Sequence, residues 1–151
     1  MSYPIDNLVY TYGNNSNQSV AVSDQTNSTE GFRDGNQNGA DFSYDDHGNM
    51  TSDLNKKIHA VYYNHLNLPV KIKFNGVGEN EINYLYNALG VKLGKIVVRT
   101  TEEQGTMKNE TAYLTGFQYL DSNLQFFPTA EGYVSVVDGQ KFNYVYNYTD
   151  H

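Results

Sequence analysis

The sequence lacks cysteine and tryptophan, and only ten of its 151 residues are lysine or arginine. Without cysteine the chain can form no disulfide framework and no thiolate metal site, and it has no thiol nucleophile. The basic residues are scattered and the formal net charge is −7, which disfavours a nucleic-acid backbone or an anionic membrane as partner. No apolar run approaches the ~20 residues that span a bilayer. We therefore expect no nucleic-acid partner and no membrane span.

Aromatic and turn-forming residues are abundant instead. The chain has 14 tyrosines, 7 phenylalanines and 13 glycines, and asparagine recurs throughout. Tyrosine and phenylalanine favour strands, while glycine and asparagine favour turns. No segment keeps a sustained helical period, and the length fits one domain. These features predict an all-β fold of consecutive antiparallel hairpins.

A short pattern occurs three times between residues 42 and 95. In each copy a tyrosine closes an alternating strand, an Asp or Asn follows, two residues intervene, and Gly or Asn stands where the chain turns back. The three sets are Tyr44, Asp45 and Gly48; Tyr63, Asn64 and Asn67; and Tyr86, Asn87 and Gly90. The Asp and Asn side chains can bond the backbone two residues on, and Gly or Asn tolerates positive φ. We predict tight turns here, with each tyrosine hydroxyl near water at the rim.

At these residues the chain resembles the YD-repeat, or RHS, proteins, whose repeat reads roughly aromatic-x-Tyr-Asp-x-x-Gly-x-Leu. Residues 42–51, FSYDDHGNMT, match best, whereas the other two copies replace the Asp by Asn. Residues 126–133 and 144–151 are similar to the start of the RHS core region of Bacteroidetes-type members. In such proteins the last residues run on into Leu-Gly-Asn-Val-Arg, so we interpret the chain as a fragment.

The resemblance implies a fold, a function and partners. RHS proteins of bacteria wind their hairpins into a curved or spiralling sheet that closes as a shell around a C-terminal toxin or effector, often in secreted polymorphic toxin systems. The fragment would then be a non-catalytic segment of shell wall, secreted or at the cell surface. Its partners would be the remainder of the shell and the toxin cargo. The Asp-Pro-x-Gly core motif that accompanies cleavage in the family is not present in this sequence.

We divide the hairpin region 1–151 into four parts by composition. Residues 1–22 form a degenerate repeat, residues 23–41 a polar loop, residues 42–99 the three repeats, and residues 100–151 the hairpins that resemble the RHS core. Within the last part we expect strands at 112–120 and 124–127, and a hairpin turn at Asp138-Gly139. We expect a bulge at Gly94. On the strand that follows the second repeat turn, Val70, Ile72 and Phe74 predict one buried face, opposite Lys71 and Lys73.

One segment has the spacing of a calcium loop. Asp34, Asn36 and Asn38 occupy positions one, three and five, and Asp45 falls at position twelve. Against this, position eight is Asp41 instead of an apolar residue, and the flanking segments are predicted strands. An Asn- and Gly-rich loop that satisfies its own backbone is the favoured interpretation, with no metal cofactor.

No catalytic group is evident, and one alternative function stays open. His47 and His65 are expected at equivalent turn positions, which favours a structural role. A carbohydrate-binding or cell-surface-binding β module would use exposed tyrosines and asparagine-rich loops. Tyrosine rings packed between hairpins would favour a shell wall, and three or more exposed in one concave patch would favour the binding module. An unpaired strand edge at the end of the array would also permit self-association.

Overall fold

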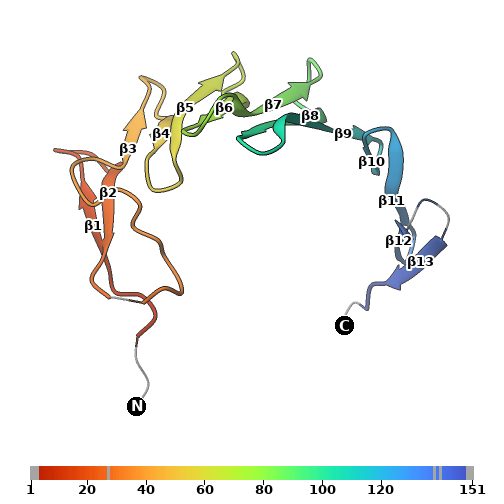
Figure 1. Cartoon of the computed structure of the whole chain (residues 1–151), viewed down its shortest axis with the longest axis horizontal. Helices are drawn as coiled ribbons and strands as arrows, with labels where there is room; N and C mark the ends of the chain where they lie inside the picture. Colours follow the sequence, from red (N-terminus) through yellow and green to blue (C-terminus); the bar gives the residue numbers. More distant parts are fainter. Residues whose placement is uncertain (1–3, 27, 138, 140, 149–151) are drawn as a thin grey trace. The chain divides into compact units, whose positions relative to one another are not determined.

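The computed structural model describes residues 4–26, 28–137, 139 and 141–148, and these residues form antiparallel β-strands and no helix. The chain divides into two compact units, Met1–Asn75 and Gly76–His151, each of which is described by itself. In both units the strands follow one another as hairpins (Figure 1). The predicted all-β class, built from consecutive antiparallel hairpins, is confirmed.

The first unit holds a separate hairpin and a meander. Strands β1 (Leu8–Tyr12) and β2 (Ser19–Asp24) form a two-stranded sheet, with a register shift at Tyr12. The meander comprises β3 (Phe42–Tyr44), β4 (Met50–Asp53), β5 (Ile58–Tyr63) and β6 (Pro69–Phe74) in chain order. Residues 25–41 join the two parts without strand, apart from the undescribed residue 27. Strand β2 therefore extends two residues into the segment predicted as loop.

The second unit is a meander of seven strands in chain order. They are β7 (Asn80–Tyr86), β8 (Lys92–Thr101), β9 (Gly105–Leu114), β10 (Phe117–Leu120), β11 (Asn123–Thr129), β12 (Gly132–Val137) and β13 (Lys141–Tyr146). The β8–β9 hairpin is the longest, because both strands have ten residues. Each strand pairs antiparallel with the next.

Two predictions about strand boundaries are wrong. The expected strand 112–120 is interrupted by a turn at Thr115 and Gly116, whose φ angles of 49° and 88° reverse the chain. The expected bulge at Gly94 lies one residue earlier, because Leu85 pairs with Gly94 and Tyr86 with Lys92. Leu93 is thus the extra residue. The predicted turn at Asp138-Gly139 lies partly outside the described residues.

Few apolar side chains are fully buried in the described residues of either unit. Among the described residues only three apolar side chains are buried, Val22, Val61 and Val134. All six residues of β6 are half-buried, so the prediction of one buried face opposite the lysines is wrong. The sheets therefore have no thick hydrophobic core, and apolar side chains remain accessible on the strands.

Candidate functional site

The three predicted turns share one geometry, and we call them the Asx turns: residues 45–49, 64–68 and 87–91. In each turn the Oδ1 atom of the first residue accepts hydrogen bonds from the backbone N–H groups two and four residues further on, at 2.8–3.1 Å. The backbone N–H of the same first residue donates to the carbonyl four residues further on, and its carbonyl accepts from the N–H three residues further on. One side-chain oxygen thus fixes a three-residue hairpin loop.

The residue that reverses the chain lies in the left-handed region in all three Asx turns. The φ angles are 84° at Gly48, 56° at Asn67 and 80° at Gly90. Glycine adopts these values without a Cβ penalty, and asparagine is among the few other residues that tolerate them. This backbone requirement explains the Gly or Asn at the fourth position of each copy.

Two of the three tyrosines that precede the turns use their hydroxyls in hydrogen bonds to the backbone. The Tyr44 hydroxyl donates to the Ser19 carbonyl at 2.8 Å, and the Tyr63 hydroxyl donates to the Met50 carbonyl at 2.7 Å. In both cases the acceptor belongs to the preceding hairpin, so the ring lies across it. The expectation of a rim hydroxyl in water is therefore wrong for these two residues. Each tyrosine instead ties its own hairpin to the one before.

The electrostatics of the repeat follow from these contacts. The Asn49 side chain and the backbone N–H groups of the turn lower the pKa of Asp45 below its ordinary value. Burial of the ring raises the pKa of the Tyr63 hydroxyl, and the negative charge of Asp45 raises it further. Burial also raises the pKa of Tyr86, with a smaller contribution from Tyr84. Asp45 is therefore held ionised, and both tyrosines are held neutral.

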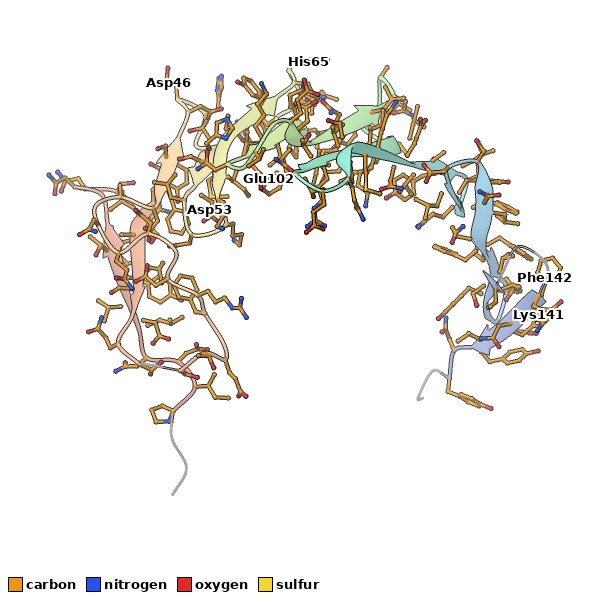
Figure 2. The ribbon with its side chains drawn as sticks, in the orientation of Figure 1. Asp46, Asp53, His65, Glu102, Lys141 and Phe142 are labelled. Carbon is orange, nitrogen blue, oxygen red and sulfur yellow. The ribbon has the colours of Figure 1, made fainter. Side chains whose placement is uncertain are left out.

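Two neighbouring Asx turns are linked through their side chains. The Asn49 amide donates to Asp45 Oδ2 at 2.9 Å and to Asn67 Oδ1 at 3.0 Å. Asp46 and His65, which belong to these two turns, lie at the same end of the first unit's hairpins, whereas Asp53 lies toward the other end (Figure 2). The turns thus form a polar row along one border of the meander.

The histidines are not equivalent, contrary to expectation. The backbone N–H of His47 donates to Asp45, and the corresponding donor in the second turn is Leu66. His65 therefore corresponds to Asp46 instead of His47.

The residues of the candidate calcium loop are not brought together. Next to Asp34, the Gly35 N–H donates to the Asn55 side chain, which follows the end of β4. At that end of β4, Asp53 pairs with Phe42. Asp45 lies at the opposite end of the same hairpin, where its carboxylate is engaged by its own turn. In the described part of the chain, no three or more histidine and acidic side chains are placed to hold a metal ion.

The same loop contains a buried polar cluster that sequence reasoning missed. Asp41 is 1% exposed, and its carboxylate accepts from the Val22 N–H at 2.7 Å and from the Asn36 amide at 3.0 Å. Asn55 Oδ1 accepts from the N–H groups of Gly35 and Asn36. These bonds pin the long loop to β2 and to the β4–β5 turn. The only available signal was an acidic residue directly before a predicted strand.

Asp53 is also 1% exposed, and it stands opposite Phe42 in the residue pairing of β3 with β4. Its carboxylate accepts from the backbone N–H of Lys56 at 3.1 Å and pairs with the exposed Lys56 ammonium at 2.8 Å. This arrangement closes the β4–β5 turn in the way that an Asp at the start of a turn commonly does. Both of these contacts of its carboxylate are with Lys56 of its own turn, which favours a structural role.

Exposed aromatic residues concentrate on the last described strand. Phe142, Tyr144 and Tyr146 alternate along β13 and are each more than half exposed. Their face continues inward as a series of ring contacts, from Phe142 to Phe127 at 6.4 Å and from Phe127 to Phe117 at 5.4 Å between centroids. Their alternate positions along β13 place the three residues on one face of the sheet.

Comparison with protein-family models, with curated proteins and with solved structures finds no match to this chain. Among the described residues, no helix has the length and apolar character needed to cross a bilayer.

Proposed function

We propose that this chain is a non-catalytic structural segment of an RHS-type shell, which encloses or presents a C-terminal toxin or effector. The observation that carries the proposal is the Tyr–Asx hairpin: the same turn recurs three times, and tyrosine hydroxyls bond one hairpin to its predecessor. Such units stabilise one another through neighbour contacts, which is how repeat arrays build an extended wall.

The scarcity of buried apolar residues supports the same proposal. A wall has two faces and gains stability from lateral pairing, so each segment needs little core of its own. Only three buried apolar side chains are found in the described residues, while strand pairing runs without a break from β7 to β13 of the second unit. The curved or spiralling arrangement, the secreted location and the toxin cargo are parts of the proposal that come from the family resemblance.

The decisive test is the reading frame that encodes this chain. The proposal expects it to continue into further RHS core sequence with the Asp-Pro-x-Gly motif, followed by an unrelated effector domain. The parent protein, purified and treated with protease, should protect that effector until the shell is opened. A parent that lacks the core motif, or an effector cleaved at once in the intact parent, would refute the proposal.

A second function is favoured by one observation, the aromatic face of β13. Exposed tyrosine rings stack on sugar rings, so Phe142, Tyr144 and Tyr146 could form part of a carbohydrate-binding or cell-surface-binding module. Tyr44 and Tyr63, in contrast, lie against neighbouring hairpins. A glycan array would separate the two functions, because a binding module should retain specific glycans and lose them on Tyr144→Ala.

A further inference from the structure

Strand β13 is the edge of the second unit's meander as far as the structure describes it. It pairs with β12 over six residues, from Gly132 opposite Tyr146 to Val137 opposite Lys141, and the register contains no shift. No described strand pairs with its other side. A regular, unpaired edge offers a row of backbone donors and acceptors to another strand. Figure 2 shows Lys141 and Phe142 at the start of this strand.

The direction of the free backbone groups can be worked out from one hydrogen bond. The N–H of Asn147 donates to the Glu131 carbonyl, so it points toward β12. Since backbone groups alternate sides along an antiparallel strand, those of Val145 and Asn143 also point toward β12. The N–H and C=O groups of Phe142, Tyr144 and Tyr146 therefore point away from the sheet. The residues with free backbone groups are the same ones that carry the exposed rings.

We propose that β13 pairs antiparallel with β13 of a second copy of this chain, with Tyr144 on the two-fold axis. In this register Phe142 lies opposite Tyr146 of the second copy, and Tyr144 lies opposite itself. Each of these pairs matches outward N–H groups with outward C=O groups, as a hydrogen-bonded antiparallel pair requires. All three pairs place aromatic rings side by side on one face, where cross-strand aromatic pairs are stabilising.

The chemistry of the edge favours a second copy over an arbitrary strand. Lys141 is the only charged residue of β13, and the two-fold register sets it opposite Asn147, so no like charges meet. The aromatic face that reaches Phe117 through Phe127 becomes continuous across both copies. A two-fold pairing also closes on itself, because each copy uses the same patch.

The edge of β1 is a poorer site for such pairing. Strand β1 also lacks charge, but its register with β2 shifts between Thr11 and Tyr12. The extra residue is Val20 of β2, and a bulge of this kind increases the twist of the pair, so β1 offers a less regular edge than β13. Pairing of β1 with β13 of another copy would be head to tail, and it would extend into filaments instead of closing. The inference concerns residues 1–151 by themselves in solution; in the proposed shell, the strand that follows would take the same edge.

The test measures self-association of the full chain by sedimentation equilibrium over a wide range of concentration. We expect a monomer–dimer equilibrium that weakens about tenfold on Tyr144→Lys, since the substitution sets two like charges directly opposite each other. Leu114→Lys is the matched control, because Leu114 and Tyr144 are both 62% exposed but Leu114 lies on an inner strand. Its dimer affinity should equal that of the unsubstituted chain.

Register can be tested separately because the chain has no cysteine. A hydrogen-bonded antiparallel pair brings Cα atoms to about 5.5 Å, within the range that a disulfide spans. Tyr144→Cys should therefore form an intermolecular disulfide under mild oxidation, while Phe142→Cys should form it much more slowly. A monomer at every concentration, open-ended growth, equal loss of affinity in Leu114→Lys, or equal cross-linking of both cysteine variants would overturn the proposal. None of these results would alter the reading-frame test.

Discussion

One oxygen atom closes each Asx turn, and in the first turn that oxygen belongs to an acid. Asp45 accepts the same two backbone hydrogen bonds that Asn64 accepts in the second turn. Its second oxygen adds a bond from Asn49. These bonds favour the ionised form, so the pKa of Asp45 is lower in the folded chain than in the unfolded chain. The first turn is therefore sensitive to acid in a way that the asparagine turns are not.

This asymmetry gives the first prediction. A lowered pKa contributes stability that is present above the ordinary carboxyl pKa of about 4, and it is lost as pH falls through the lower folded value. Asp45→Asn keeps the Oδ1 acceptor but cannot titrate. The difference in unfolding free energy between the original chain and Asp45→Asn should therefore shrink as pH falls below about 4. Urea unfolding at a series of pH values would measure it.

The control for that experiment is the neighbouring acid. Asp46→Asn changes the net charge by the same amount, yet Asp46 does not accept the bonds that close the turn. The effect of Asp46→Asn on stability therefore measures what the loss of one negative charge does by itself. A steeper change for Asp46→Asn than for Asp45→Asn would contradict this account of the turn.

The second prediction concerns the tyrosine hydroxyl that joins two hairpins. Tyr63→Phe removes the donor to the Met50 carbonyl and should lower the unfolding free energy by about 1 kcal/mol. Tyr62→Phe is the matched control, because Tyr62 is the adjacent residue of β5 and is half exposed. It should change stability by less than about 0.5 kcal/mol. Equal effects in thermal or urea unfolding would show that the ring, and not the hydroxyl bond, joins the hairpins.

At the level of elements, the positive-φ residue of each turn decides whether a hairpin can form. Gly48 has φ of 84°, and a Cβ placed there would meet nothing closer than Gln18 Nε2 at 3.6 Å. The cost of Gly48→Ala is therefore conformational, about 1–2 kcal/mol. Gly48→Asn should cost less, because Asn67 already occupies the same position in the second turn. Chemical unfolding of both variants checks the order.

Gly13→Ala provides the comparison for this third prediction. Gly13 lacks a positive φ, and a Cβ there would meet its nearest neighbour at 3.6 Å as well. The steric surroundings of Gly13 and Gly48 are thus alike, but alanine would be strained by the backbone conformation only at position 48. If Gly13→Ala destabilised the chain as much as Gly48→Ala, the left-handed conformation would not be the reason for glycine in the turn.

The hairpins were predictable from the sequence because their causes are local. Tyr44, Asp45 and Gly48 stand within five residues, and the turn needs nothing else. The turn at Thr115 and Gly116 escaped prediction because a threonine with positive φ has no local signature, and its strands read as one alternating run. The acceptors of the tyrosine hydroxyls could not be predicted either. They lie in the preceding hairpin, up to 25 residues away, where strand register decides the contact.

At the scale of the whole molecule, the polar cluster around Asp41 likewise could not be predicted from local sequence. Its partners come from β2, from the long loop and from the β4–β5 turn, segments that only the fold brings together. The spacing of this loop also fitted a calcium motif, the less favoured of the two interpretations, because that spacing is local. The structure uses Asn36 to hold Asp41 instead, and it leaves Asp45 at the far end of the hairpin. The spacing thus identified polar residues that do make hydrogen bonds, but their partners are other protein groups and not a shared metal ion.

The surface area of the chain leads to the last prediction. The accessible surface is 11390 Å² for a mass of 17.1 kDa. A globular protein of this mass exposes about 7,800 Å² when folded and about 24,800 Å² when unfolded. The chain therefore buries only about four-fifths of the area that a globular protein would bury on folding. Since the heat-capacity change and the denaturant m-value scale with buried area, both should lie about a fifth below the values usual for 151 residues.

Scanning calorimetry and urea unfolding at low protein concentration provide these two quantities. Low concentration matters because pairing of β13 between two copies would bury additional surface and raise both values. We therefore expect the m-value to increase with protein concentration in the original chain and to stay constant in Tyr144→Lys. A full globular value in the dilute Tyr144→Lys chain would mean that the monomer buries more surface than its hairpins provide, which contradicts a fold stabilised by lateral pairing with almost no core.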